Sequence, residues 1–336
     1  MNIGVLGAGT WGVALASLLV KNGHNVRLWS AIPEEIDQLQ NNRTHKNLPG
    51  IVLPTSITYT KSISELAKGQ EMILFVVPSS FIRSVAESIC DHLDPETIIV
   101  TAAKGIERGS LMTMTEVIED VIKNKHSDLD YHIAALSGPT HAEEVAIEMP
   151  TSIVAASENE EISSKIAEAF ANSCMRVYTN SDVKGVEICG AMKNIIALAA
   201  GINNGMGLGD NSKAMLMTRG IAEITRLGLA LGCERRTFMG LAGIGDLIVT
   251  CTSHHSRNNR CGELIGKGLS YDEASKEIGM VVEGYHALEA AMELSKKHSV
   301  ELPITEAVYN VIKKGISPKD AIYKLMTREL KSELQD

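Results

Sequence analysis

The spacing of apolar residues changes once along this chain, near residue 182, and the change divides it into two parts. In the first part, short apolar runs alternate with stretches in which apolar residues recur every three or four positions. This alternation is typical of strands and helices that build a parallel sheet. The predicted strands are residues 3–6, 25–29, 72–77, 98–101, 132–136, 152–156 and 176–178.

After residue 182 the helical spacing is nearly continuous, and we find no internal repeat, low-complexity tract or proline-rich linker. The pattern predicts a Rossmann-type, doubly wound, mostly parallel α/β domain at residues 1–181 and an all-α domain at residues 182–336. The predicted helices of the second part are residues 186–200, 212–231, 284–298, 303–314 and 318–330.

The first predicted strand runs directly into a GxGxxG turn at residues 7–12, and a helical pattern follows. In this setting Gly7 would form the tight turn, Gly9 would let the backbone approach a pyrophosphate, and Gly12 would let the helix pack closely on its strand. A purely structural turn and the similar loop of some methyltransferases are the alternatives. The placement between strand and helix favours dinucleotide binding.

The choice between NAD and NADP is left open by the second predicted strand, which ends in Ser30 and Ala31. An acidic residue at this point would favour NAD, and a nearby arginine would favour NADP. Neither is present. Glu34 and Glu35 follow Pro33, and we interpret them as charges at the N-terminus of the next helix.

The composition, with 44% hydrophobic and 22% charged residues over 336 positions, is that of an ordinary two-domain globular protein. Acidic residues outnumber basic ones by 41 to 32, so the net charge of −9 provides no broad positive field for nucleic acid or anionic lipid. Any anionic ligand must be held by locally placed cations. We expect a small-molecule partner and no nucleic acid.

The N-terminal sequence leaves no room for a secretion signal before the first strand, and no apolar run reaches the length needed for membrane insertion. The cysteines show no CxxC or Cys/His ligand spacing, so we expect reduced, partly buried thiols in a cytoplasmic protein and no metal centre. They are Cys90, Cys174, Cys189, Cys233, Cys251 and Cys261.

Polar residues follow two of the predicted strands, where open α/β sheets bind ligands. Lys104 comes after the strand at 98–101 and could neutralise a substrate anion, although a solvated lysine in a glycine turn is equally consistent. Residues 137–142 follow the strand at 132–136, with Pro139 suited to the first turn of a helix. The amide groups of that turn could face a ligand, or the turn could be structural. His141 is interpreted as a surface or packing residue.

The predicted helix near residue 190 carries Gly190, Lys193, Asn194 and Ala197 on one face. Burying an ammonium group among apolar residues is costly unless it is paired. We interpret Lys193 as a lysine near a second cation, with its pKa lowered toward neutrality, that moves a proton to or from a hydroxyl or carbonyl. The alternative is a lysine that extends to solvent at the rim of the helix.

A further segment, residues 241–260, combines an acidic residue with a predicted helix start. Ser256 is a suitable N-cap, which places Arg257 and Asn258 in the first turn. The helix dipole disfavours an arginine there unless an anion binds at the same end. Asp246 could pair with Lys193, accept a substrate hydroxyl, or cap a short helix. His254 and His255 are interpreted as polar loop residues without a metal.

Together these motifs resemble the bacterial glycerol-3-phosphate dehydrogenase family, from about residue 2 to about residue 326. The chain departs from the family at Ala31, where members often carry arginine or histidine, and at Ala103, where they commonly carry threonine. The matching motifs are GAGTWG at 7–12, KG at 104–105, SGPTHAEEV at 137–145, GAMKN at 190–194, LAGIGDL at 241–247, TCTSHHSRN at 250–258 and VVEGY at 281–285.

The resemblance implies interconversion of dihydroxyacetone phosphate and sn-glycerol 3-phosphate with NAD or NADP for phospholipid synthesis. We expect the reaction in the cleft between the sheet domain and the helical domain. The sequence leaves the oligomeric state open, and a homodimer is one possible assembly. The resemblance also implies catalysis by Lys193, the proton donor and acceptor, with Lys104 and Asp246. The implied substrate residues are Lys104, Gly138, Thr140, Lys193, Asn194, Asp246, Ser256, Arg257 and Asn258; the implied cofactor residues are Gly7, Gly9, Thr10, Trp11, Gly12, Lys104, Ala142, Arg257, Val281 and Glu283.

Two other functions compete with this one. A β-hydroxyacid dehydrogenase also pairs a Rossmann domain with a helical domain and an active-site lysine, but such enzymes usually separate the lysine from its asparagine. In this chain Lys193 and Asn194 are adjacent. A non-catalytic dinucleotide sensor would bind cofactor and leave Lys104, Lys193 and Asp246 without a role.

Overall fold

The computed structural model describes residues 1–126 and 128–333, which form two compact units. Unit 1 comprises residues 1–104 and 112–183, and unit 2 comprises residues 105–111 and the chain from Lys184 onward. The sequence pattern divides the chain only once, near residue 182. The structure also assigns the short segment 105–111 to the helical unit.

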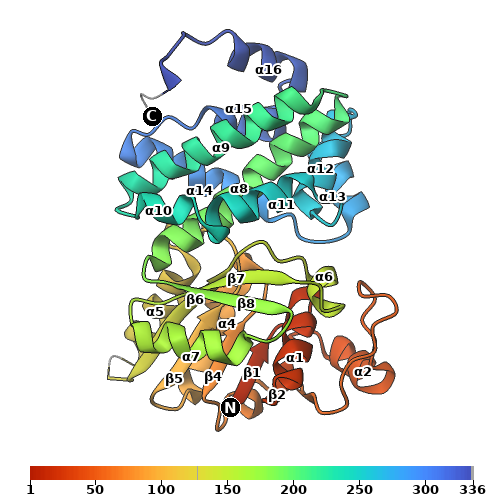
Figure 1. The fold of residues 1–336 in the computed structure, drawn as a ribbon, viewed down its shortest axis with the longest axis vertical. Coiled ribbons are helices and arrows are strands. Elements are labelled where there is room, and N and C mark those ends of the chain that lie inside the picture. The colour runs from red at the N-terminus through yellow and green to blue at the C-terminus, as the bar shows by residue number, and fades with distance from the viewer. Residues whose placement is uncertain (127, 334–336) are drawn as a thin grey trace. The chain divides into compact units, whose positions relative to one another are not determined.

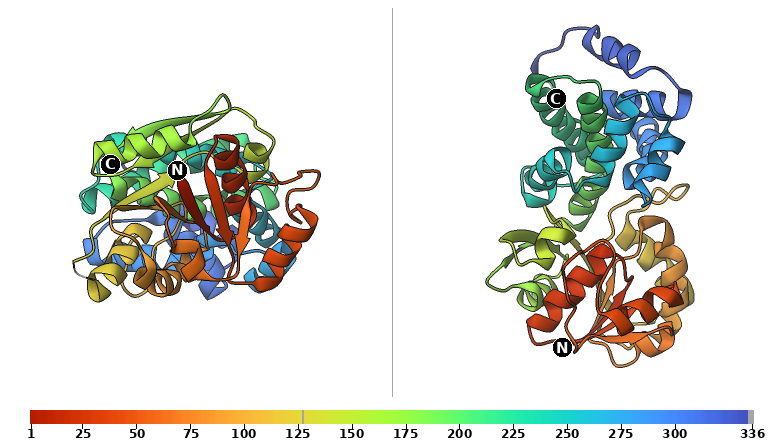
Figure 2. Two further views of the ribbon diagram at one scale, coloured as in Figure 1. Left: turned by 90° about the horizontal axis from the view of Figure 1, so that it is seen from below. Right: turned by 90° about the vertical axis from the view of Figure 1, so that its right-hand side faces the viewer.

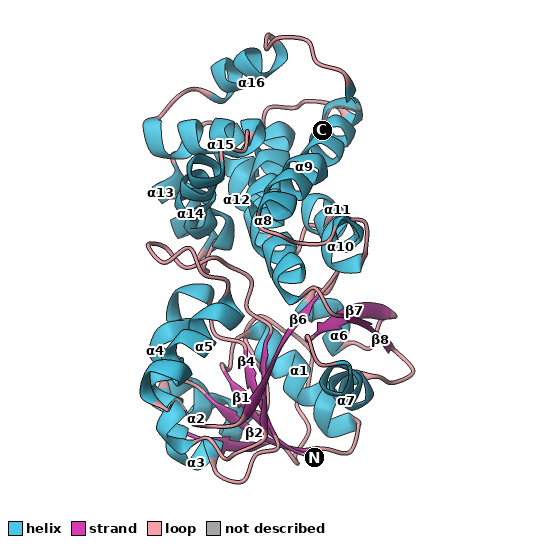
Figure 3. Cartoon of the chain, turned by 90° about the vertical axis from the view of Figure 1, so that its left-hand side faces the viewer, coloured by secondary structure: helices cyan, strands magenta, loops and turns pink. Residues whose placement is uncertain are grey.

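Unit 1 contains an eight-stranded sheet with the order β3-β2-β1-β4-β5-β6-β7-β8 (Figures 1 and 3). All neighbouring strands are parallel except β6 and β7, which are antiparallel. This confirms the predicted mostly parallel, doubly wound sheet. The strands are β1 (Asn2–Leu6), β2 (Asn25–Trp29), β3 (Thr58–Thr60), β4 (Met72–Phe75), β5 (Thr97–Thr101), β6 (Tyr131–Ser137), β7 (Thr151–Ala156) and β8 (Met175–Asn180).

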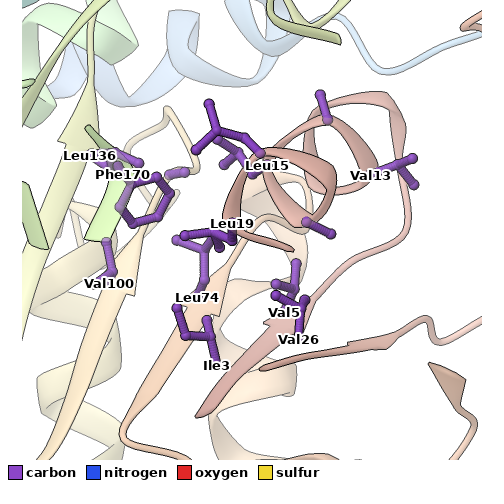
Figure 4. Close-up of a cluster of buried hydrophobic side chains, with 14 of the residues drawn as sticks. Ile3, Val5, Val13, Leu15, Leu19, Val26, Leu74, Val100, Leu136 and Phe170 are labelled. Atoms are coloured by element: carbon purple, nitrogen blue, oxygen red, sulfur yellow. The ribbon is translucent and has the colours of Figure 1, made fainter. Parts of the chain in front are cut away.

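Helices cover both faces of this sheet because its central strands are apolar on both sides. Leu74 of β4 packs into one apolar cluster with Ile3 and Leu19 (Figure 4). Its neighbours Ile73 and Phe75 pack into a second cluster. The described helices of unit 1 are α1 (Thr10–Lys21), α2 (Pro33–Asn42), α3 (Ile63–Ala67), α4 (Ile82–Ile89), α5 (Met114–Lys125), α6 (Ala142–Ala146) and α7 (Glu160–Phe170), with short 3-10 turns η1 (Ser79–Phe81) and η2 (Cys90–His92).

Unit 2 is helical, as predicted, and its helices pack around α8 (Val183–Gly205) (Figures 2 and 3). The other elements are α9 (Asp210–Ala230), α10 (Arg235–Phe238), a π-helical turn η3 (Leu241–Gly245), α11 (Asp246–Thr252), α12 (Arg257–Gly266), α13 (Tyr271–Ile278), α14 (Glu283–His298), α15 (Pro303–Lys314) and α16 (Pro318–Met326).

Helix α8 is long and apolar enough to cross a membrane, contrary to the expectation that no run reaches that length. The whole of its most apolar 18-residue window is buried inside the protein. A helix that is apolar all round is typical of the core of a large helical unit. We therefore interpret α8 as the core helix of unit 2.

Glycines bring α8 and α12 into direct backbone contact. A Cβ atom at Gly201 of α8 would lie 2.0 Å from the carbonyl oxygen of Asn259, and one at Gly262 of α12 would lie 2.1 Å from that of Leu198. Gly205 and Gly266 make equivalent contacts one turn further along. This close crossing packs α12 against the C-terminal half of α8.

Replacing Gly262 with alanine should therefore destabilise unit 2, although alanine is intrinsically the better helix former. The added methyl group meets rigid backbone, and overpacking of this kind typically costs about 1–3 kcal/mol. Urea denaturation should show a lower midpoint for Gly262→Ala. Gly209→Ala is the matched control because a Cβ there meets no atom within 4 Å. Equal midpoints for the two variants would contradict the close crossing.

The segment 105–111 connects β5 to the chain leading into α5, and it is anchored within unit 2. Ile106 is buried in the apolar core of the helical unit. The Nε atom of Arg108 lies 2.7 Å from the Oε2 atom of Glu289 on α14. Residue 104 is thus the last residue of unit 1 before the chain enters unit 2.

Candidate active site

The glycine turn in unit 1 adopts the geometry expected for pyrophosphate binding. Gly7 has a φ of +121° and donates its N–H to the carbonyl oxygen of Trp29. A Cβ atom at Gly12 would lie 1.9 Å from the carbonyl oxygen of Gly7, so only glycine lets α1 pack this closely. Gly9 is exposed, a Cβ atom there would meet nothing within 4 Å, and α1 follows it without a side-chain cap. The open face and uncapped amide groups fit an anionic ligand.

Thr10 and Trp11 open α1 and are both half-buried. The side-chain amide of Asn47 donates to the Oγ1 atom of Thr10 at 3.3 Å, which places the loop after α2 next to the glycine turn. Both residues therefore lie beside the predicted pyrophosphate position.

A carboxylate does lie at the end of β2, although the sequence places none there. The Ser30 hydroxyl donates to the Oε2 atom of Glu35 at 2.7 Å, and the Ile32 N–H donates to that same hydroxyl oxygen. Glu34 and Glu35 both stand in the first turn of α2, as expected. The interaction of Glu35 with Ser30 was missed because the acid comes from the following helix.

Three predicted residues meet at the carboxyl ends of the neighbouring parallel strands β5 and β6. The Nζ atom of Lys104 donates to the carbonyl oxygen of Gly138 at 3.1 Å. The Thr140 hydroxyl donates to the same oxygen at 3.2 Å. The prediction for Pro139 is wrong: helix α6 begins at Ala142, so Pro139 lies in the preceding loop rather than in a first helical turn. Ala142 itself is buried.

In unit 2, Lys193 forms a buried ion pair with Asp246. Its Nζ atom donates to the Oδ1 atom of Asp246 at 2.6 Å and to the hydroxyl of Thr250 at 2.6 Å. The two charged residues are only 6% and 1% exposed, so Lys193 does not extend to solvent. The adjacent carboxylate favours the ammonium form, whereas the sequence suggested a lysine driven toward neutrality by a second cation.

Asp246 is the first residue of α11, whose N-cap is Gly245. Thr250 stands one turn later on the same helix, and its hydroxyl also donates to the Asp246 carbonyl oxygen. Thr250 was not among the residues predicted from the sequence. The spacing of four between Asp246 and Thr250 is the signal that could have found it, because it places both on one helix face.

Two asparagines connect the helices around Lys193. The side-chain amide of Asn258 donates to the Oδ1 atom of Asn194 at 2.9 Å, and its own Oδ1 atom accepts from the Gly284 N–H at 2.9 Å. Asn194 in turn donates to the carbonyl oxygen of Gly190. These bonds hold the N-terminal ends of α12 and α14 against α8.

Helix α12 begins as predicted, with Ser256 as its N-cap. The Ser256 hydroxyl accepts from the Asn259 N–H at 3.2 Å, and Arg257 and Asn258 occupy the first turn. No acidic residue stands in that turn. A half-buried arginine at the positive end of a helix is the arrangement expected for an anion site.

Val281 and Glu283 lie at the start of α14, which the bond from Gly284 to Asn258 ties to α12. Both are half-buried. Their roles come only from the family resemblance, because neither their residue type nor their spacing carries a chemical signal.

Cys251 lies on α11 near the ion pair without taking part in it. Burial raises the pKa of its thiol to about 12. The group therefore stays neutral at physiological pH and is a packing residue rather than a nucleophile. All six cysteines are free thiols, as expected.

Comparison with known proteins identifies the family. The model for the N-terminus of NAD-dependent glycerol-3-phosphate dehydrogenase matches residues 2–163, and the model for its C-terminus matches residues 182–323. The chain is 53% identical over 332 residues to glycerol-3-phosphate dehydrogenase (NAD(P)+) 2 of Lactobacillus delbrueckii, which covers 99% of this chain and 98% of the relative. It is 47% identical to glycerol-3-phosphate dehydrogenase (NAD(P)+) of Fusobacterium nucleatum, and the match covers 100% of this chain and 99% of the relative.

The crystal structure of glycerol-3-phosphate dehydrogenase from Coxiella burnetii has the same fold. It superposes with a TM-score of 0.91 at 36% identity and covers 97% of this chain and 99% of its own. Both family models, the relatives of similar length and this crystal structure all point to glycerol-3-phosphate dehydrogenase. This chain belongs to the NAD-dependent glycerol-3-phosphate dehydrogenase family.

Proposed function

We propose that this chain interconverts dihydroxyacetone phosphate and sn-glycerol 3-phosphate with NAD or NADP. The observation that carries the proposal is the buried Lys193–Asp246 pair, held on α8 and α11 in a chain that matches the dehydrogenase family along both halves. The buried pair supplies a proton-transfer group, and the first turn of α12 supplies an anion site.

Unit 1 would hold the cofactor. The open Gly9 backbone and the uncapped N-terminus of α1 would take the pyrophosphate, with Thr10 and Trp11 beside it. When bound, the nicotinamide group supplies or accepts the hydride. Ala142, Arg257, Val281 and Glu283 are proposed as further cofactor contacts from the family resemblance.

Lys193 would hold and move the proton at the substrate O2 atom. Asp246 keeps the ammonium form favoured, so that in the reductive direction Lys193 can donate a proton as negative charge develops on O2. Thr250 and Asp246 fix the position of Nζ through two bonds of 2.6 Å each. In the oxidative direction the same nitrogen would take the proton back.

Arg257 and the amide groups at the start of α12 would bind the substrate phosphate, with Ser256 and Asn258 shaping that turn. Asn194 supports the turn through its bond to Asn258. In unit 1, Lys104, Gly138 and Thr140 form a second polar group in which the Lys104 ammonium would attract the anionic substrate.

Replacing Glu35 with glutamine should raise the ratio of kcat/KM for NADPH to that for NADH. The Glu35 carboxylate lies at the end of β2, where a Rossmann domain meets the 2′ position of the ribose, and it would repel a 2′-phosphate. Removing the repulsion between one carboxylate and a nearby 2′-phosphate is worth about 1 kcal/mol, so the ratio of kcat/KM values should change roughly fivefold. Glu34→Gln, the neighbouring acid, is the control. An unchanged ratio in Glu35→Gln would exclude this role.

We further propose a physiological setting, in which only the role in phospholipid synthesis comes from the family resemblance. The enzyme would act in the cytoplasm and supply glycerol 3-phosphate for phospholipid synthesis, and it would assemble as a homodimer. Size measurement by light scattering tests the last point directly.

Absorbance of NADH, and separately of NADPH, tests the activity. We expect loss of absorbance with dihydroxyacetone phosphate and much slower loss with dihydroxyacetone, because the uncharged compound cannot use the anion site. A dinucleotide sensor would bind cofactor but consume neither form. No consumption with either cofactor would overturn the proposed function.

A further inference from the structure

Three side chains with metal-binding atoms meet in unit 1, among residues that no step of the proposed reaction uses. Cys90 and Asp91 lie in the η2 turn after α4, and His126 follows α5. The Sγ atom of Cys90, a carboxylate oxygen of Asp91 and a ring nitrogen of His126 all lie within 4.8 Å of one another. Within residues 1–126 and 128–333 this is the one such group of three or more.

The sequence does not show this group because His126 is 35 residues from Asp91. The packing of α4 against α5 brings their C-terminal ends together. The group is therefore a product of the fold, and ligand spacing along the chain could not predict it.

The separations of the ligand atoms lie on either side of those in a tetrahedral zinc site. The Nε2 atom of His126 is 2.7 Å from the Oδ1 atom of Asp91, and the Cys90 Sγ atom is 3.9 Å from that oxygen. Zinc bond lengths in proteins place nitrogen and oxygen ligands about 3.4 Å apart and sulfur and oxygen ligands about 3.6 Å apart. Small side-chain rotations would bring all three atoms onto one ion.

Lys125 interacts with both the Asp91 carboxylate and the Cys90 side chain, so a bound ion would compete with its ammonium group for these two partners. Its Nζ atom donates to the carbonyl oxygen of Glu87 at 2.8 Å and lies 3.7 Å from the Oδ2 atom of Asp91. The Oδ1 atom of Asp91 thus faces Cys90 and His126, while Oδ2 faces the ammonium group. A carboxylate held in this way by an outer partner is a common feature of metal sites.

We propose that Cys90, Asp91 and His126 bind a divalent transition-metal ion of the zinc class. Thiolate, imidazole and carboxylate ligands together favour zinc over magnesium or calcium, and the charges of the thiolate and carboxylate balance those of the ion. Binding converts the Cys90 thiol to a thiolate and releases its proton to solvent, and water completes the coordination. The ion would connect the ends of α4 and α5 and stabilise unit 1.

Cobalt(II) is the probe, because a cobalt–thiolate bond gives a charge-transfer absorption that cobalt bound to oxygen and nitrogen lacks. The full chain, treated with chelator and then freed of it, is titrated with cobalt chloride. We expect one equivalent to produce the thiolate band, zinc chloride to abolish it, and zinc to raise the melting temperature.

Cys90→Ser should abolish the band, and Cys174→Ser should leave it unchanged. Because Cys90 is buried, its variant could fold poorly, so the surface variant His126→Ala provides a second test: its cobalt affinity should fall by about 10-fold or more. His132→Ala, which removes a histidine paired with Glu96, is its control. Absence of a thiolate band in the wild-type chain, or equal affinity in His126→Ala, would overturn the site.

Discussion

Replacing Lys193 with methionine should lower kcat for dihydroxyacetone phosphate reduction by about 100- to 10,000-fold, the range typical of lost general acid catalysis. Methionine keeps the length of the side chain but cannot donate a proton. Affinity for NADH should stay unchanged, because the glycine turn belongs to unit 1. Steady-state kinetics and fluorescence titration of NADH measure the two quantities.

Stability must be separated from catalysis in this variant. Removing Lys193 leaves the buried Asp246 carboxylate without its cation, and breaking a buried pair costs about 3–5 kcal/mol. The double variant Lys193→Met with Asp246→Asn removes both charges and should regain stability without regaining turnover. Lys267→Met, which breaks an exposed pair with Glu263, is the control. Turnover near the wild-type value in a folded Lys193→Met would refute the assignment.

Replacing Arg257 with methionine should weaken use of the phosphorylated substrate. Hydrogen bonds to a charged group are worth about 1.5–3 kcal/mol, so kcat/KM for dihydroxyacetone phosphate should fall by about 10- to 150-fold. The loss for dihydroxyacetone should be much smaller, since that compound has no phosphate for the guanidinium group to bind. Initial rates with both compounds give the comparison.

Arg260→Met is the matched control for this variant. Arg260 stands on the same helix but is exposed, whereas Arg257 is half-buried. Its removal should change neither rate. Because Arg257 is also proposed to contact the cofactor, affinity for NADH is measured in the same variant. Equal losses for the charged and uncharged compounds in Arg257→Met, with unchanged affinity for NADH, would exclude a phosphate site at the start of α12.

Much of the fold could be predicted from local pattern. Strands such as β5 consist of consecutive buried residues with an apolar centre, and the structure confirms their positions. The exception is β3, which has three residues, of which only Thr60 is buried, and so carries little apolar signal. The predicted helix at 318–330 ends at Met326. The apolar spacing continues to Leu330, but that side chain is 97% exposed and has no core to pack on in the described part of the chain.

The candidate site was also partly predictable, because some of its residues stand out in the local sequence pattern. Lys193 stood out as a charge within an apolar helix, and Ser256 as a cap, since both are local signals. The bond from the Gly284 N–H to Asn258 and the contact of Ser30 with Glu35 depend on segments that meet only in the folded chain. The glycines at the crossing of α8 and α12 bring these helices close together, which makes the bond between Gly284 and Asn258 possible. Their role could not be predicted from the sequence, because it depends on which helices pack together.

The most direct measurement follows one atom from cofactor to product. NADH carrying deuterium at both C4 positions is incubated with dihydroxyacetone phosphate, and the glycerol 3-phosphate formed is analysed by mass spectrometry and NMR. Our account predicts one deuterium per product molecule, bonded to C2, with the proton on O2 exchanging with solvent. A product without deuterium at C2, or no glycerol 3-phosphate, would contradict it.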